Sequence, residues 1–323
     1  MKQPSTALDR RREQEAEQAR IAQVLEGLRE DPPRLSPIWF YDRRGSLLFE
    51  RICDLPEYYP TRTELAIMRE QAGAMARALG PRVALIEPGS GASLKTRLLL
   101  DALDRPAAYV PVDISGEHLM DSARALRRDY PVLRVEPVCA DFTQPFPLPV
   151  AVRSARRRVV YFPGSTIGNF AREEAVALLR RLCSMAGEDG ALLLGVDRVK
   201  PVDVLERAYN DEAGVTAEFN LNALRHLNRE LGAGFDLTAF RHRAPWVADH
   251  SRIEMHLVAQ RDTTFSVGSE SFAMRRGDYL LTEYSHKYTI EDATAKAAAA
   301  GLVVRGVWSD ASDWFSVLLL APA

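Results

Sequence analysis

The stretch that most constrains this chain is VALIEPGSGASLK, at residues 83–95. An apolar run ends in Glu87, the turn Gly89-Ser90-Gly91 follows, and residues 92–100 can start a helix. A strand, a glycine turn and a helix in this order are typical of nucleotide-binding α/β folds. Glycine lets the backbone turn sharply and approach a ligand, and a helix start offers unpaired N–H groups. The sequence therefore predicts a ligand site at this junction.

The details of the turn favour one kind of ligand over others. A third glycine at dinucleotide spacing is missing, and Lys95 is not part of a phosphate-binding GK[ST] loop. Two further acids follow apolar runs, Asp113 after residues 108–112 and Asp141 after residues 135–140. With Glu87, these acids resemble the strand tips of a Rossmann-like S-adenosylmethionine (SAM) site, where Asp113 accepts from ribose and Asp141-Phe142 binds adenine. The alternatives are a turn without a ligand and ordinary helix N-caps.

Composition excludes several classes of function. The 323 residues carry a net charge of −2, so no broad basic surface is expected for nucleic acid. The three cysteines lie far apart, which argues against disulfides or a zinc cluster, and the histidines lack metal-binding spacing. Neither a signal peptide nor a membrane-spanning run is evident, so we expect a cytoplasmic protein with no metal, and a monomer as the working expectation.

The pattern along the chain predicts an α/β fold. Strands are expected near 83–87, 108–112, 133–138, 158–162 and 191–196, and the runs 303–308 and 314–320 are expected to pair antiparallel. From Arg198 the alternation changes to two helices and antiparallel strands. We expect a Rossmann-like class I methyltransferase sheet with an inserted α+β substrate-binding domain. The expected SAM-binding domain comprises 62–197 and 287–323, and the expected substrate-binding domain comprises 9–61 and 198–286.

The segment 36–64 is dense in aromatic residues and is interrupted by Gly45, Pro56 and Pro60. Because glycine and proline break regular structure, we expect loops that form a lid over the ligand. A core-filling role for the same aromatic residues is the alternative. Thr63 is expected to cap a helix over residues 64–79.

These features together resemble the SAM-dependent histidine Nα-methyltransferases of ergothioneine biosynthesis, from about Ser36 to the C-terminus. The motifs that carry the resemblance are WFYD (39–42), LPEYYPTRTE (55–64), EPGSG with Lys95, Asp113, Asp141-Phe142, GSTIGN (164–169), RAYNDEAGVTAEFN (207–220), RIEM (252–255) and LTEYS (281–285).

The resemblance implies a role for each matching residue. The implied SAM contacts are Gly89, Gly91, Lys95, Asp113, Asp141 and Phe142. The implied contacts to the amino-acid part of histidine are Tyr58, Asn169 and Tyr209, with Tyr58 chosen over Tyr59. The implied ring contacts are Glu283 and Ser285 with the intervening Tyr284, and the implied pocket walls are Tyr41, Phe49 and Met255. Asn169 and Tyr41 are the implied catalytic residues, since a neutral acceptor and an aromatic face suit an uncharged amine and a growing methylammonium.

Two features bear on the ring contacts. Glu283 and Ser285 are two residues apart, so on a strand they face one side and Tyr284 faces the other. A carboxylate at 283 favours a protonated imidazole, whereas the Ser285 hydroxyl can serve as donor or acceptor. Tyr284 is larger than expected between them, and Pro88 stands where an apolar residue is more usual.

The resemblance implies transfer of methyl groups from SAM to the α-amino nitrogen of free histidine, three times, giving the betaine hercynine. One alternative is the same fold acting on another free amino acid such as tryptophan, which Glu283 disfavours because indole has one donor. A second is a non-catalytic SAM-binding protein. A third, a nicotinamide dehydrogenase, is disfavoured by the missing third glycine. The sequence shows no general base.

Overall fold

The computed structural model describes residues 7–91 and 94–323. The chain divides into two compact units. We call Glu50–Ala208, Trp246–Ile253 and Tyr284–Ala323 the large unit, and the described residues up to Phe49, Tyr209–Pro245 and Glu254–Glu283 the small unit.

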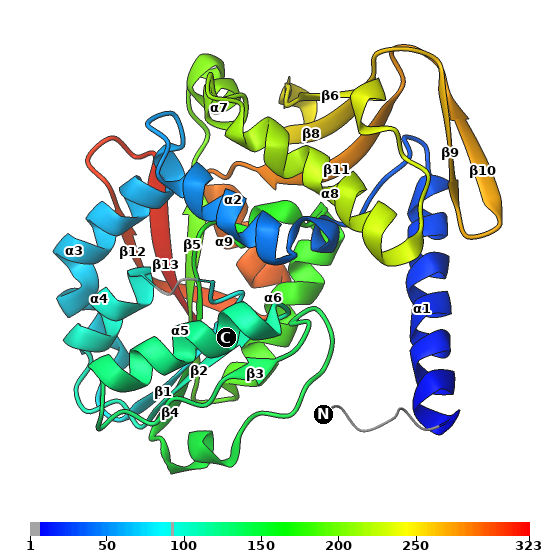
Figure 1. The fold of residues 1–323 in the computed structure, drawn as a ribbon. Helices are drawn as coiled ribbons and strands as arrows, with labels where there is room; N and C mark the ends of the chain where they lie inside the picture. The colour runs from blue at the N-terminus through cyan, green and yellow to red at the C-terminus, as the bar shows by residue number, and fades with distance from the viewer. Residues whose placement is uncertain (1–6, 92–93) are drawn as a thin grey trace. The chain divides into compact units, whose positions relative to one another are not determined.

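A seven-stranded sheet in the order β12-β13-β5-β4-β1-β2-β3 forms the centre of the large unit (Figure 1). Its strands are β1 (Val83–Pro88), β2 (Ala108–Asp113), β3 (Val138–Cys139), β4 (Arg157–Phe162), β5 (Ala191–Asp197), β12 (Leu302–Ser309) and β13 (Phe315–Pro322). The strands β1 to β5 pair parallel, and β13 runs antiparallel to both β5 and β12. The predicted α/β fold and the antiparallel final pair are confirmed.

Helices cover both faces of this sheet, and this explains why its central strands are continuously apolar. Every residue of β1 and of β5 is buried. On one face pack α3 (Tyr59–Leu79), α4 (Leu94–Ala102) and α5 (Gly116–Asp129), and on the other pack α6 (Arg172–Ala186) and α9 (Ile290–Ala299) (Figure 1). The predicted start of the helix after the glycine turn falls on residues 92–93, outside the described residues.

The third strand is shorter than predicted. Only Val138 and Cys139 form the ladder with β2, and Val135 adds a single bridge to Tyr109. Pro137 lies between these points, and proline has no N–H to donate to a ladder. The large unit also contains η2 (Val150–Ser154), η3 (Thr166–Asn169), most of α7 (Val202–Tyr209), β7 (Trp246–Val247) and η5 (Ala248–His250).

The aromatic segment 36–64 is more helical than predicted. It forms η1 (Pro37–Phe40), α2 (Arg43–Cys53) and the start of α3, so Gly45 and Pro60 lie within helices. A side chain at Gly45 would come 1.6 Å from the carbonyl oxygen of Phe40, so glycine is there for close approach. Pro60 sits in the first turn of α3, where its missing N–H costs nothing. The predicted Thr63 cap is therefore wrong; its hydroxyl donates to the carbonyl of Tyr59 at 2.9 Å.

The small unit combines helices with an antiparallel sheet. Its helices are α1 (Ala7–Leu28), η1, α8 (Val215–Leu231) and η4 (Leu237–Ala239), and α8 packs on η1. Its strands are β6 (Phe240–Arg243), most of β8 (Arg252–Ala259), β9 (Thr263–Val267), β10 (Glu270–Met274) and the first part of β11 (Tyr279–His286), of which β9 and β10 form a hairpin. Strands β11, β8 and β6 lie side by side, with β7 also on β8. Among the described helices, none has the length and apolarity needed to cross a membrane.

Candidate active site

The glycine turn after β1 is held against the end of β2. Gly89 and Gly91 have φ angles of +68° and +48°, which favour glycine. The amides of Gly89 and Ser90 donate to the carbonyl of Val112 at 2.7 and 3.2 Å, and the amide of Gly91 donates to Asp113 Oδ2 at 3.3 Å. The structure therefore brings together the predicted residues Gly89, Gly91 and Asp113 at the carboxyl ends of two parallel strands, where α/β folds bind ligands.

Asp113 and Asp141 also accept hydrogen bonds from residues in the turns that follow them. Asp113 Oδ1 accepts from the amide of Ser115 at 2.9 Å, just before α5. Asp141 Oδ1 accepts from the amide and the hydroxyl of Thr143, at 2.8 and 2.7 Å. Both bonds to Asp141 use Oδ1, and among the described residues no recorded bond uses Oδ2. The turn-forming and ligand-binding interpretations of these two acids are thus compatible.

Phe142 joins three loops at this edge of the sheet. A Cβ atom on Gly89 would lie 3.6 Å from the Phe142 ring, so the ring borders the glycine turn. Phe142 also meets Phe162 and Phe170 edge to face, with centroids 5.6 and 6.4 Å apart. Phe170 follows Asn169 directly, so the glycine turn, the third strand tip and the loop after β4 converge.

Glu64 ties Lys95 to the loop after β4. Lys95 on α4 pairs with Glu64 of α3, which is fully buried and also accepts from the amide of Gly164 at 2.9 Å. The sequence singled out Lys95 but not Glu64, although Glu64 ends the motif LPEYYPTRTE. An ammonium has three donors, so pairing with Glu64 leaves Lys95 able to bind a second carboxylate.

Glu87 corrects the picture of three equivalent acidic strand tips. Its side chain is 2% exposed and accepts from the hydroxyls of Thr96, at 2.6 Å, and Tyr109. Burial raises the pKa of Glu87 to about 7, against the opposing effect of these two hydrogen bonds and of Lys95. Glu87 therefore points into the protein, and among the three acids only Asp113 and Asp141 are partly exposed.

Asn169 and Ser285 lie on adjoining backbone segments of the large unit. Gly168, in η3, accepts from His286 Nδ1 at 2.8 Å, and a Cβ atom on Gly168 would come 2.8 Å from the His286 carbonyl oxygen. Burial lowers the pKa of His286 to about 4, so its ring is neutral and carries the proton on Nδ1. The turn with Asn169 is thus fixed beside the end of β11, which carries Ser285.

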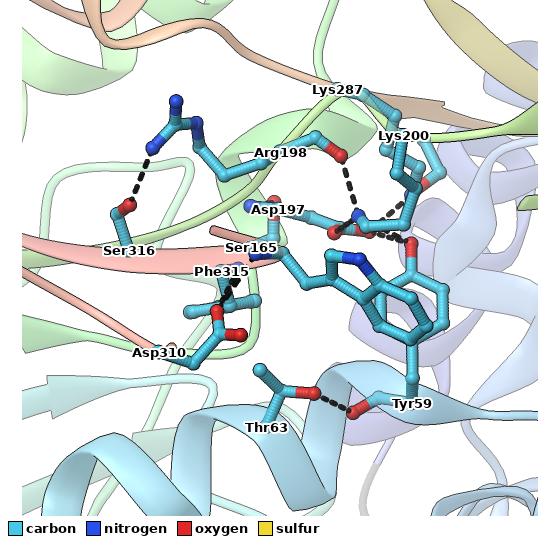
Figure 2. Close-up of polar contacts among 12 residues, drawn as sticks. Tyr59, Thr63, Ser165, Asp197, Arg198, Lys200, Lys287, Asp310, Phe315 and Ser316 are labelled. Carbon is cyan, nitrogen blue, oxygen red and sulfur yellow. Dashed lines mark hydrogen bonds and ion pairs between the residues drawn. The ribbon is translucent and has the colours of Figure 1, made fainter. Parts of the chain in front are cut away.

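A buried charged cluster surrounds Asp197 and was not predicted from the sequence (Figure 2). Asp197 ends β5 at 1% exposure and pairs with Lys200 and, at 2.8 Å, with Lys287. The Tyr59 hydroxyl donates to Asp197 Oδ2 at 2.7 Å, and Lys287 Nζ donates to Ser285 Oγ at 2.7 Å.

This cluster also separates the two neighbouring tyrosines. Tyr59 is 1% exposed and committed to Asp197, whereas Tyr58 is half-buried. The prediction that Tyr58 rather than Tyr59 contacts the substrate is compatible with this difference in burial. The contact itself stays a prediction.

Tyr41 and Phe49 lie together in the small unit, as their predicted roles as pocket walls require. Their ring centroids are 6.1 Å apart, and both meet Phe219 of α8, at 5.7 and 5.9 Å. Phe219 also stacks obliquely on Phe40 at 4.6 Å. Phe219 was not among the predicted site residues, although it lies inside the motif RAYNDEAGVTAEFN.

A chain of polar groups fixes the backbone of Tyr209 in the small unit. His242 Nε2 donates to the Tyr209 carbonyl at 2.7 Å, and Asn220 Nδ2 donates to His242 Nδ1 at 2.9 Å. The Thr282 hydroxyl lies 2.8 Å from Asn220 Oδ1 and 2.9 Å from the carbonyl of Met255. Burial lowers the pKa of His242, so the ring stays neutral in this chain. The chain joins the backbones of two predicted substrate contacts, Tyr209 and Met255.

The remaining predicted ring contacts all lie on β11. The Arg252 guanidinium lies over the Tyr284 ring, 3.7 Å from its centroid, and Tyr284 meets His286 edge to face at 5.7 Å. Tyr41, Phe49, Tyr209, Met255 and Glu283 belong to the small unit, and the other predicted site residues belong to the large unit.

Within residues 7–91 and 94–323, no group of three or more His, Cys, Asp or Glu side chains could hold a metal ion. The three cysteines are unpaired.

A mixed seven-stranded sheet of this order, with a glycine turn after β1 and acidic residues after β2 and β3, agrees with the predicted Rossmann-like methyltransferase fold. The model of the SAM-dependent, histidine-specific methyltransferase family matches residues 20–322, and the chain belongs to this family. It is 40% identical over 301 residues to a histidine N-alpha-methyltransferase of Mycolicibacterium smegmatis, covering 92% of each chain. It is also 40% identical over 303 residues to a histidine N-alpha-methyltransferase of Mycobacterium tuberculosis, covering 92% of this chain and 93% of that one. Ergothioneine biosynthesis protein 1 of Neurospora crassa is 30% identical over 293 residues, which cover 88% of this chain and 33% of that protein.

Proposed function

We propose that this chain transfers methyl groups from SAM to the α-amino nitrogen of free L-histidine, three times, and releases the betaine hercynine. The observation that carries the proposal is the 40% identity, over 92% of the chain, to relatives named histidine N-alpha-methyltransferase. Such a relationship covers both units rather than the SAM-binding sheet alone.

The large unit is proposed to bind SAM. Gly89 and Gly91 bring the backbone close to the amino-acid part of SAM, and Lys95 pairs with its carboxylate. Asp113 accepts from the ribose hydroxyls through a side chain that already receives the Gly91 amide. Asp141 and Phe142 bind the adenine, Asp141 through Oδ2 and Phe142 through its ring.

The proposed histidine contacts are those that the family resemblance implies. Tyr58, Asn169 and Tyr209 hold the amino-acid part of histidine, and Glu283 with Ser285 binds the ring. Tyr41, Phe49 and Met255 are proposed walls, and Tyr284 separates the two ring contacts. The proposal therefore assigns SAM binding to the large unit and most substrate contacts to the small unit.

Each transfer is a displacement at the methyl carbon of SAM. The lone pair of the neutral α-amine forms the N–C bond while the C–S bond breaks, and its electron pair returns to sulfur, giving S-adenosylhomocysteine. Asn169 offers a neutral acceptor, so it does not stabilise the unreactive ammonium as a carboxylate would. The aromatic rings of Tyr41 and Phe49 favour the methylated cation. The proton released after each of the first two transfers passes to water, and holding nitrogen, carbon and sulfur in line supplies most of the acceleration.

Mass spectrometry of histidine incubated with SAM and the purified protein tests this proposal. We expect products heavier by one, two and three methyl groups. The variant Glu283→Ala should raise the KM for histidine on the order of 10- to 100-fold, because a charged hydrogen bond is lost, while the Kd for SAM stays within about twofold. If tryptophan is turned over faster than histidine, the proposed substrate is wrong. If SAM binds but no methylated product forms, the protein is a non-catalytic SAM-binding protein.

The expected cytoplasmic location and monomeric state stay predictions. Light scattering of the purified protein, alone and with SAM, measures the second directly.

A further inference from the structure

The loop after β4 carries Asn169 and is bonded to the end of β11 and to the segment that follows it. His286, the last residue of β11, donates from Nδ1 to the Gly168 carbonyl at 2.8 Å. The Tyr288 hydroxyl donates to the Ile167 carbonyl at 3.3 Å. Two consecutive carbonyls just before Asn169 are therefore held by side chains from one distant segment of the large unit.

Gly168 allows the two backbone segments to lie against each other. A Cβ atom on Gly168 would come 2.8 Å from the carbonyl oxygen and 3.1 Å from the amide nitrogen of His286. The first of these distances is shorter than a Cβ atom tolerates. The close approach depends on glycine, and it brings the His286 ring within hydrogen-bond reach of the Gly168 carbonyl.

The His286 ring is a neutral donor with its proton in a known place. A carbonyl oxygen can only accept, so Nδ1 must carry the proton. Burial lowers the pKa of His286 to about 4, against the effect of the bond to Gly168, and Arg252, Lys296 and Lys287 lower it further. A lysine or arginine donor here would add a positive charge near three others, whereas a neutral imidazole does not.

The bond from His286 reaches Asn169 through one peptide group. The Gly168 carbonyl and the Asn169 amide belong to the same peptide, and a peptide group is planar. Fixing the direction of the carbonyl therefore fixes the plane from which Asn169 starts. We propose that His286 is a positioning residue for methyl transfer, which sets Asn169 at the α-amino group of histidine through the Gly168–Asn169 peptide. This inference rests on the proposed function, which assigns Asn169 to that group.

The same loop offers a matched control. His286→Leu removes the donor to the Gly168 carbonyl and leaves an apolar side chain of similar size. Tyr288→Phe removes the donor to the carbonyl one residue earlier, and the Ile167 carbonyl still accepts from the Phe170 amide at 3.4 Å. His286→Asn is the conservative variant, because the amide nitrogen of asparagine lies at about the same reach as Nδ1 of histidine and also donates.

Steady-state kinetics with histidine and SAM compare these three variants with the unaltered protein. We expect His286→Leu to lower kcat about 10- to 100-fold, because small misplacements of a positioned group have effects of this size. His286→Asn should recover most of the loss, and Tyr288→Phe should keep kcat within about twofold. Calorimetry should give a Kd for SAM within about twofold of the unaltered value in all three, and its stoichiometry measures the folded fraction.

Two further variants test the route of the effect. Asn169→Ala removes the side chain that His286 is proposed to position, so adding His286→Leu to it should lower kcat by no more than about twofold. Gly168→Ala keeps every donor but places a Cβ atom against the backbone of His286. It should therefore lower kcat although the His286 ring is intact.

Nitrogen NMR of isotopically labelled protein examines the ring without kinetics. The ring signals of His286, identified by their loss in His286→Asn, should show a neutral imidazole with its proton on Nδ1 at neutral pH. The same signals should be unchanged in Tyr288→Phe.

Four results would contradict the inference. These are an unchanged kcat in His286→Leu, an equal loss of kcat in Tyr288→Phe, effects of His286→Leu and Asn169→Ala that multiply in full, and a ring proton on Nε2. Failure of the unaltered protein to methylate histidine would instead overturn the proposed function, and the inference with it.

Discussion

Asp197 and Glu87 lie at the carboxyl ends of two parallel strands of the same sheet and are almost equally buried, at 1% and 2% exposure. Their surroundings differ. Asp197 faces two ammonium groups, and its pKa is lowered against the effect of burial. Glu87 receives hydroxyls from Thr96 and Tyr109, and burial raises its pKa to about 7. Burial alone therefore does not decide whether a strand-tip acid is charged; the partners that come from other elements decide it.

The largest effect is expected at the charged acid. The variant Asp197→Asn keeps the shape of the side chain but leaves the ammonium groups of Lys200 and Lys287 without a buried counter-charge. Removing one partner of a buried ion pair costs about 3–5 kcal/mol. We expect a loss of this size in the free energy of unfolding at pH 7, measured by urea denaturation.

The variant Glu87→Gln is the control, because it replaces a buried acid at the same edge of the sheet without leaving a buried cation unpaired. Its loss of stability at pH 7 should be much smaller. Adding Lys200→Met to Asp197→Asn should recover part of the loss. Equal losses in the two single variants would contradict the distinction between a charged and a proton-bearing acid.

The pH dependence of stability separates the same two acids. Glu87 has an ordinary pKa of 4.5, raised to about 7 in the folded protein. Between these pH values the folded protein keeps a proton that the unfolded chain releases. The stabilisation from Glu87 is therefore complete below pH 4.5 and is lost as the pH rises through about 7. At 1.36 kcal/mol per pKa unit, the change is roughly 3 kcal/mol.

Urea denaturation of the unaltered protein and of Glu87→Gln, from pH 4 to pH 8, measures this contribution. As the pH rises from 4 to 8, the free energy of unfolding of the unaltered protein should fall relative to that of Glu87→Gln. Asp197 has the opposite sign: its lowered pKa stabilises the fold above its ordinary pKa of 3.8, and this is lost only at more acidic pH. An unchanged difference between the two proteins from pH 4 to pH 8 would show that Glu87 is not a proton-bearing acid.

The sequence was sufficient to predict the sheet and the position of two acidic residues at the carboxyl ends of its strands. Buried parallel strands are continuously apolar, and the residue that ends each one falls at a common edge, so Asp113 and Asp141 could be placed there. Gly89 and Gly91 have positive φ angles, a backbone conformation that favours glycine. Because this requirement is local, it is visible in the sequence as two glycines.

What the sequence did not predict depends on contacts between distant segments. Nothing local states that Glu87 turns inward to Thr96 and Tyr109, or that Lys200 and Lys287 share Asp197. Lysine in a sequence is normally read as exposed, since it is rarely buried without a partner. The rule that glycine and proline interrupt regular structure also gave a wrong prediction for segment 36–64. A proline fits in the first turn of a helix, and a glycine fits in a helix where a carbonyl oxygen approaches its Cα closely.

The smallest effect on stability is expected at two buried tyrosines, one of which contacts Glu87. Tyr109 and Tyr161 are both fully buried, on β2 and β4. The Tyr109 hydroxyl donates to Glu87, whereas the Tyr161 hydroxyl finds no hydrogen-bond partner among the described residues. Tyr109→Phe should cost about 1 kcal/mol in the free energy of unfolding, and Tyr161→Phe should be neutral or slightly stabilising, because it removes a buried polar group without a partner.

The same pair tests the pKa of Glu87. The hydrogen bond from Tyr109 lowers that pKa, so Tyr109→Phe should move the upper end of the pH window above about 7. Tyr161→Phe removes no hydrogen bond to Glu87 and should leave the window in place. Equal stabilities and equal pH windows in the two variants would show that the Tyr109 hydroxyl does not hold the Glu87 carboxyl.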